Sequence, residues 1–94
     1  MNKIERFEDI IAWQKARELT RQVYGFSKAG EFARDFGLRD QIQRASISTM
    51  ANIAKGFERG GDKEFIQLLS HSKGSSGEMK SHLYVALDQH YVTD

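Results

Sequence analysis

The spacing of apolar residues in the last third of the chain constrains the fold more than any other feature. Small or apolar side chains, with one histidine at the end, recur there at alternating steps of four and three: Phe65, Leu69, Ser72, Ser76, Met79, Leu83, Ala86 and His90. Such a repeat is typical of a helix that packs along one face against other helices. It predicts a long helix over about residues 62–90, with Asp62 as its N-cap.

Two earlier segments also have helical spacing. The first, about residues 8–29, carries the stripe Ala12, Ala16, Leu19, Val23 and Phe26. Glu8 and Asp9 are expected in its first turn, where carboxylates suit the helix dipole, and Gly30 is expected to stop it. The second, about residues 38–57, has a stripe of Leu38, Ile42 and Ala45 and another of Ile47, Met50, Ala54 and Phe57. Because these stripes cover more than one face, this helix is predicted to be the most buried.

The segments between the helices contain glycine. Residues 30–37 are predicted to form a loop, with Phe32 and Phe36 packed against the bundle. Gly60 and Gly61 predict a turn. Two interior glycines of the last helix, Gly74 and Gly77, suggest the close approach of a neighbouring helix, with a local kink as the alternative. The fold class is therefore all-α, an up-and-down helical bundle.

Composition limits the class of protein. The chain has 94 residues, which predicts a single domain over residues 1–94. It contains no cysteine, and this excludes disulfides and thiolate metal sites. No apolar run reaches membrane-spanning length and the N-terminus lacks the apolar segment of a signal peptide. We therefore expect a cytoplasmic protein with no membrane role.

Basic residues cluster on the first predicted helix, although the net charge is only +1. Arg17 and Arg21 are four residues apart, opposite the apolar stripe, and Lys28 lies seven beyond Arg21. This pattern indicates either an ordinary solvated face or a surface that attracts phosphate. No aromatic residues are expected among these cations, so binding would be salt-sensitive and tolerant of sequence.

Polar residues on the second helix also form a pattern. Arg44, Ser48 and Asn52 follow one another at steps of four and so share a face. They could contact a ligand or partner. The interpretation we favour is a buried hydrogen-bond network that fixes helix pairing, because the helix is otherwise apolar.

Catalytic and metal-binding patterns are weak. Glu78 and His82 are four apart and could face one metal ion, but the other helices offer no matching inward Glu or His. No serine has a plausible base and acid nearby in pattern. We expect no metal, no cofactor and no enzymatic activity.

Three groups of residues resemble a known bacterial family. They are Phe7 to Ala16, with Trp13-Gln14-Lys15; Gln41 to Arg59, with Gln41-Ile42-Gln43-Arg44-Ala45 and Ala51-Asn52-Ile53-Ala54-Lys55-Gly56; and Gly74-Ser75 to Glu78 and Leu83. The chain is similar to the four-helix-bundle proteins encoded by intervening sequences within 23S ribosomal RNA genes. This family includes the accessory protein of diversity-generating retroelements.

The resemblance implies an up-and-down four-helix bundle that assembles as a ring, typically a homopentamer. It also implies a context of ribosomal RNA or, for the retroelement member, binding of a reverse transcriptase and nucleic acid. In such a ring Arg44 and Arg59 could join Arg17, Arg21 and Lys28 at a pore. The sequence predicts three long helices, and against this resemblance we expect the family's fourth helix to be missing.

We therefore expect a non-catalytic, oligomeric accessory protein that binds RNA, DNA or a nucleic-acid enzyme through a basic surface. The alternatives are an assembly scaffold with no nucleic-acid role, whose groove docks a partner helix, and a truncated relic of the family. The two binding roles differ in their salt dependence, because added salt weakens phosphate binding and leaves apolar docking intact.

Overall fold

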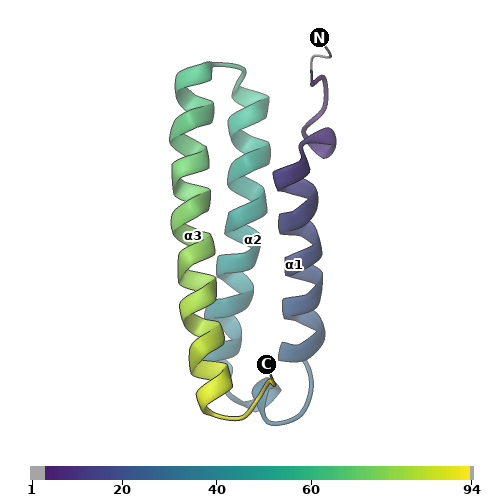
Figure 1. Cartoon of the computed structure of the whole chain (residues 1–94), viewed down its shortest axis with the longest axis vertical. Coiled ribbons are helices and arrows are strands. Elements are labelled where there is room, and N and C mark those ends of the chain that lie inside the picture. The colour runs from purple at the N-terminus through teal and green to yellow at the C-terminus, as the bar shows by residue number, and fades with distance from the viewer. Residues whose placement is uncertain (1–3, 94) are drawn as a thin grey trace.

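The fold consists of three helices side by side (Figure 1). The computed structural model describes residues 4–93. Its elements are a short 3-10 helix η1 (Phe7–Asp9), helix α1 (Ile11–Ser27), a 3-10 helix η2 (Phe32–Arg34), and helices α2 (Phe36–Arg59) and α3 (Asp62–Asp88). The helices run up and down in an elongated body of 46 × 20 × 19 Å. No strand occurs among the described residues, so the predicted all-α class is confirmed.

Helix α1 is shorter than predicted at both ends. Glu8 and Asp9 lie in η1 instead of the first turn of α1, because Ile10 adopts an extended conformation (φ −74°, ψ 120°) that separates the two elements. At the other end α1 stops at Ser27, ahead of the predicted Gly30. Gly30 instead takes a left-handed conformation (φ 60°) in the loop, which glycine adopts at little cost.

Helix α2 begins two residues earlier than predicted. Asp35 is its N-cap, and the Asp35 side chain accepts a hydrogen bond from the backbone N–H of Leu38 at 3.2 Å. Phe36 is therefore helical, and at 63% exposure it is not packed against the bundle as expected. Its ring instead lies 4.8 Å from the guanidinium of Arg39. Phe32 meets the expectation, since it is 1% exposed.

The two glycines between α2 and α3 form the predicted turn. Gly60 caps α2 in a left-handed conformation (φ 77°), and Gly61 is the N-cap of α3. The prediction that Asp62 caps this helix is wrong. Asp62 is the first helical residue, and it lies where a carboxylate favours the positive end of the helix dipole.

Helix α3 ends in a Schellman motif before His90. The N–H of Tyr91 donates to the carbonyl of Ala86 at 2.9 Å, and the N–H of His90 donates to that of Leu87 at 3.0 Å. His90 takes the left-handed position of this motif (φ 63°). The expectation that His90 continues the apolar stripe is therefore wrong, because the chain has already left the helix and His90 is exposed.

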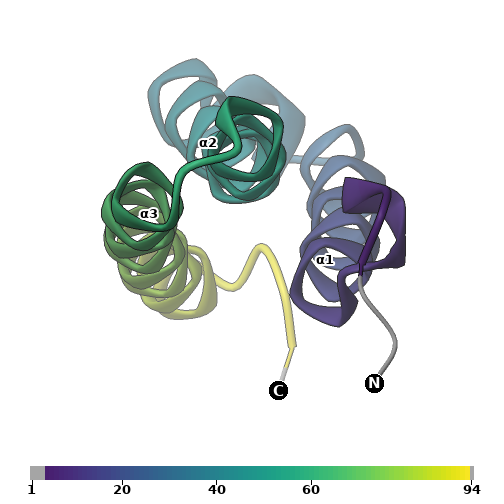
Figure 2. The same ribbon diagram turned by 90° about the horizontal axis from the view of Figure 1, so that it is seen from above.

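The core lies between α2 and its two neighbours. Helix α2 contains the largest number of buried residues, as predicted, because it packs against both α1 and α3. The second apolar stripe of α2 is less covered, and Ile47 is 45% exposed. One cluster dominates the core: Val23, Phe32, Ile42, Ala45, Met79 and Ala86. Helices α1 and α3 lie on either side of α2, and the segment that follows α3 crosses part of the space between them (Figure 2).

A different glycine from those predicted provides the close helix contact. A Cβ added at Gly56 would lie 3.0 Å from Phe65 Cδ1 and 3.2 Å from Leu68 Cβ, so α2 and α3 approach each other there. A Cβ at Gly74 or Gly77 would meet no atom within 4 Å. The prediction for Gly74 and Gly77 is thus wrong for the contacts within this chain, and α3 continues through both residues.

Candidate functional site

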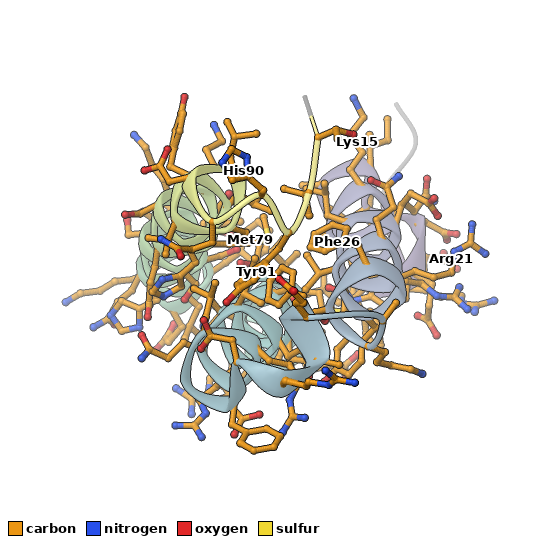
Figure 3. The ribbon with its side chains drawn as sticks, turned by 90° about the horizontal axis from the view of Figure 1, so that it is seen from below. Lys15, Arg21, Phe26, Met79, His90 and Tyr91 are labelled. Atoms are coloured by element: carbon orange, nitrogen blue, oxygen red, sulfur yellow. The ribbon has the colours of Figure 1, made fainter. Side chains whose placement is uncertain are left out.

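The first candidate surface is a hollow on the outer side of α1. Trp13, Arg17 and Arg21 succeed each other at steps of four, so the helix presents all three on one face. The segment before α1 adds Arg6 and Glu8, and the hollow has a volume of about 550 Å³. The guanidinium of Arg17 lies 5.9 Å from the ring centre of Trp13. Figure 3 shows Arg21 pointing away from the bundle.

The residues that precede α1 hold Trp13 in place. The rings of Phe7 and Trp13 meet edge to face, with centres 5.1 Å apart. The side-chain amide of Gln14 donates to the carbonyl of Glu8 at 2.9 Å, which ties η1 to α1. The expectation that no aromatic residue lies among these cations is therefore wrong. The spacing of four residues between Trp13 and Arg17 is the sequence signal that could have predicted this placement.

Two carboxylates moderate the charge of this hollow. Arg6 pairs with Glu8 at 3.2 Å, and Arg21 pairs with Glu18 at 2.8 Å. Hydrogen bonds from its own backbone amide and from Arg6 lower the pKa of Glu8, and those from Arg21 and Gln22 lower the pKa of Glu18. Both groups are therefore ionised at neutral pH. Three guanidinium groups against two carboxylates leave a small positive excess.

The other predicted cations do not line this hollow. Lys28 is the exposed C-cap of α1, and Arg59 is the exposed last residue of α2. Arg44 lines a small separate hollow of about 210 Å³ between α2 and α3, beside Ser48, Ser75 and Glu78. Of the five cations predicted to bind nucleic acid, the structure thus brings together Arg17 and Arg21, and it adds Arg6, which the sequence pattern had not indicated.

The polar residues of α2 form part of the expected network. The hydroxyls of Ser48 and Ser75 lie 2.9 Å apart and link α2 to α3. The amide of Asn52 donates to the carbonyl and hydroxyl oxygens of Ser48, at 2.9 and 3.1 Å. Arg44 does not take part, because its side chain is exposed and forms no hydrogen bond with a described residue. A second link, in which buried Ser72 donates to the carbonyl of Thr49 at 2.7 Å, was not predicted.

The second candidate surface is an open groove between α1 and α3, with a volume of about 520 Å³. Residues of α2 form its floor, and small or apolar residues of the other helices form its walls. Its full lining is Ala12, Lys15, Ala16, Leu19, Thr49, Ile53, Leu69, Ser72, Lys73, Ser76, Gly77 and Lys80. Figure 3 shows Lys15 on this open side, away from Arg21.

Other chemistry is sparse among residues 4–93. His82 Nε2 lies 3.4 Å from the Glu78 carboxylate, but no described group of three or more His, Cys, Asp or Glu side chains could hold a metal ion. None of the three helices has the length and apolar character needed to cross a lipid bilayer.

Comparison with known proteins identifies the family. No curated protein and no solved structure matches the chain at a significant level. The family model described as "23S rRNA-intervening sequence protein" matches residues 8–94. This match begins within η1 and covers all three helices, the whole groove and every residue of the hollow except Arg6. The chain therefore belongs to the family of 23S rRNA-intervening sequence proteins.

Proposed function

We propose that this protein is a non-catalytic accessory protein that binds nucleic acid through the hollow on α1. The observation that carries the proposal is that Arg6, Arg17 and Arg21 line one hollow together with Trp13, whose ring centre lies 5.9 Å from the guanidinium of Arg17. Guanidinium groups bind phosphate oxygens in pairs of hydrogen bonds. An indole offers a flat face on which an unpaired base can stack.

The geometry favours a single-stranded or looped RNA over a regular duplex. A base can reach an aromatic ring only where it is unstacked from its neighbours. The family description places related proteins in the context of a ribosomal RNA gene, which supports RNA as the ligand. The hollow offers no pattern of donors and acceptors matched to a base edge, so binding is expected to tolerate different sequences.

Oligomerisation would strengthen this role. One hollow carries only a small positive excess because Glu8 and Glu18 occupy two of its guanidinium groups. A ring of several copies, as in the pentamer implied by the family resemblance, would repeat the hollow and concentrate the positive potential. We propose such a homo-oligomer in a cytoplasmic setting, with a reverse transcriptase or ribosomal RNA as the larger partner.

The test uses the intrinsic fluorescence of Trp13, the one tryptophan of the chain. Titration with a short single-stranded RNA at low salt should quench this fluorescence as a base stacks on the indole. The logarithm of the binding constant should fall with the logarithm of salt concentration with a slope of about −2, as expected for about three phosphates of a single strand. The R17E/R21E variant should lose most of the binding and most of the salt dependence.

Two further variants make the result specific. Lys55→Glu/Lys63→Glu changes the net charge equally at residues outside the hollow, so it should bind RNA nearly as the wild type does. Glu18→Gln removes the carboxylate that competes with phosphate for Arg21, and it should tighten binding by about twofold or more. Unchanged RNA binding by the R17E/R21E variant would overturn the assignment of this surface.

A scaffold role is the second candidate, and the open groove is the observation that favours it. It requires no nucleic acid and uses a different face of α1. The two roles can therefore be tested separately, and they can coexist in one protein.

A further inference from the structure

We propose that Phe36 and Arg39 form a second stacking platform for single-stranded RNA, and that one strand follows the seam between α1 and α2 from Trp13 to Phe36. The inference rests on the proposed function, because the hollow on α1 is the first platform of the pair. It deepens that function in two ways. It gives Phe36 and Lys28 a role that the hollow does not explain, and it sets the length of strand that one copy of the protein binds.

Phe36 is a large aromatic residue that the core does not use. It lies in the first turn of α2 with 63% of its surface exposed. The guanidinium of Arg39 lies over its ring at 4.8 Å, much as that of Arg17 lies 5.9 Å from the ring centre of Trp13. An exposed ring with a cation on one face leaves the other face for a base, and such stacking accepts every base. Phe36 and Arg39 therefore repeat the chemistry of the hollow at a second place.

Trp13 lies beside α2, on the outer side of α1. Thr20 of α1 donates to the carbonyl of Ser46 of α2 at 3.1 Å, so this face of α1 meets α2. Trp13 lies seven residues before Thr20, which is about two turns, and so on nearly the same face. It lines the hollow together with Arg17 and does not line the groove between α1 and α3. The first platform thus borders the seam between α1 and α2 on the side away from the groove.

Phe36 borders the same seam near the end of α1. Gln43 of α2 donates to the hydroxyl of Ser27, the last residue of α1, at 2.8 Å. Phe36 lies seven residues before Gln43 and so on nearly the same face of α2. The space between α1 and α3 is filled at this end by Tyr91, which stacks on buried Phe32 with ring centres 5.2 Å apart. The exposed ring of Phe36 lies outside that space, so both platforms face the outer side of the seam.

The distance between the two rings sets the length of the strand. Thr20 and Ser46 touch and so lie at one level of the two helices. Trp13 lies seven residues from that level along α1, and Phe36 lies ten residues from it along α2, in the opposite direction because the helices are antiparallel (Figure 1). At 1.5 Å per residue the rings are about 25 Å apart along the helix axis. Stacked nucleotides rise about 3.4 Å each, so a strand of about eight nucleotides reaches both rings.

Lys28 supplies a cation between the two rings. It follows Arg21 by seven residues, about two turns, and is exposed as the C-cap of α1. It pairs with no carboxylate among residues 4–93. Arg39, in contrast, pairs with Asp40 at 3.0 Å. The second platform therefore binds by stacking on Phe36, and Lys28 adds the charge that a phosphate between the rings requires.

The experiment compares two fluorophore-labelled oligouridylates, one of about three and one of about ten nucleotides, by fluorescence anisotropy at low salt. Phe36→Ala should weaken binding of the longer RNA about tenfold, which is in the range expected for the loss of one stacked base. It should leave binding of the shorter RNA unchanged, because the shorter RNA occupies the hollow alone. Phe36→Tyr keeps an aromatic ring and should bind both RNAs as the wild type does.

Two further variants separate charge from stacking and from exposure. Lys28→Gln should reduce the salt slope for the longer RNA by about 0.7, the value for one phosphate of a single strand, and should not change the slope for the shorter one. Ile66→Ala is the matched control, since Ile66 is 64% exposed on α3 and lies on neither α1 nor α2. This variant should bind both RNAs as the wild type does.

The outcomes separate this inference from the proposed function. A wild type that binds the shorter RNA, with no effect of Phe36→Ala on the longer one, would overturn the second platform and leave the proposed function intact. An equal loss for both RNAs would also overturn it, because the change would then act on the hollow or the fold. Binding of neither RNA by the wild type would refute the proposed function itself, and the second platform with it.

Discussion

The two ends of the space between α1 and α3 differ in what covers them. At the end near the α1–α2 loop, Tyr91 and Val92 pack against the main core cluster. The ring of Tyr91 stacks on Phe32 with centres 5.2 Å apart, and its hydroxyl donates to Asp35 at 3.1 Å. Towards the other end no described segment covers the walls, and the lysine-lined groove remains. Figure 1 shows the C-terminal segment at the closed end only.

This difference shows that apolar spacing does not by itself decide between core and binding surface. The stripes of α1 and α3 continue through both ends with the same alternation of four and three residues. Val23 and Met79 are buried at the closed end, whereas Ala12 and Leu19 are exposed at the open end. The described residues after α3, 89–93, lie at the closed end, where Tyr91 and Val92 pack against the core cluster.

The largest expected effect is on the free energy of unfolding, and it compares core residues at the closed and open ends of the space between α1 and α3. Ile42→Ala removes a residue with 0% exposure from the main cluster and should cost about 3 kcal/mol in the free energy of unfolding. Ile53→Ala lies on the floor of the open groove, where water can fill the space, and should cost about 2 kcal/mol or less. Urea denaturation of both variants measures the difference. Equal losses would mean that the two ends are equally well packed.

The next effect tests whether α2 and α3 remain tightly joined beside the open groove. Gly56→Ala brings a methyl group within 3.0 Å of Phe65 Cδ1. The overpacking should outweigh the gain in helix propensity and destabilise the protein by about 1 kcal/mol. Gly74→Ala meets no neighbour and should stabilise the protein by about 0.5–1 kcal/mol. Thermal melting monitored by circular dichroism would contradict this view if both variants shifted Tm in the same direction.

The smallest effect concerns the covering segment itself. The hydrogen bond to Asp35, together with partial burial and the negative charge of Asp35, raises the pKa of Tyr91. The neutral phenol is thus the form that the folded state favours. Its contribution to stability should be complete below the ordinary tyrosine value of about 10 and should be lost as the pH rises through the raised pKa of the folded protein.

Ultraviolet titration should accordingly show a tyrosine phase above the ordinary tyrosine value, and Tyr91→Phe should remove that late phase. The folded variant should also lack the alkaline loss of stability that is due to this hydrogen bond. A titration in which Tyr91→Phe removes absorbance near the ordinary tyrosine value, with no late phase in the wild type, would mean that Asp35 does not hold the covering segment.

Much of the fold could be predicted from local patterns. The three helices, the Gly60-Gly61 turn and the burial of Phe32 follow from periodicity and turn chemistry. The helix boundaries could not be predicted to the residue because they depend on single interactions, such as the cap provided by Asp35 at the start of α2. Phe36 was wrongly predicted to be buried for the same reason, since an earlier helix start turned its side chain outwards.

The candidate surfaces could be predicted only in part. The spacing of Arg17 and Arg21 placed both on one face of α1, and the structure adds Trp13 and Arg6 around them. The separation of Arg44 and Arg59 from this face could not be read from spacing, because it depends on how α2 lies against α1. The close contact at Gly56 could not be predicted for a related reason. It depends on the positions of two helices, whereas a local pattern describes only one.

The sequence alone determined that this chain forms three amphipathic helices, because helix periodicity and glycine turns act between residues close together along the chain. Only the tertiary structure decided which apolar faces became core and which became a groove, and which charged residues came to lie together. Those outcomes depend on contacts between distant segments, above all on where Tyr91 and Val92 pack between α1 and α3.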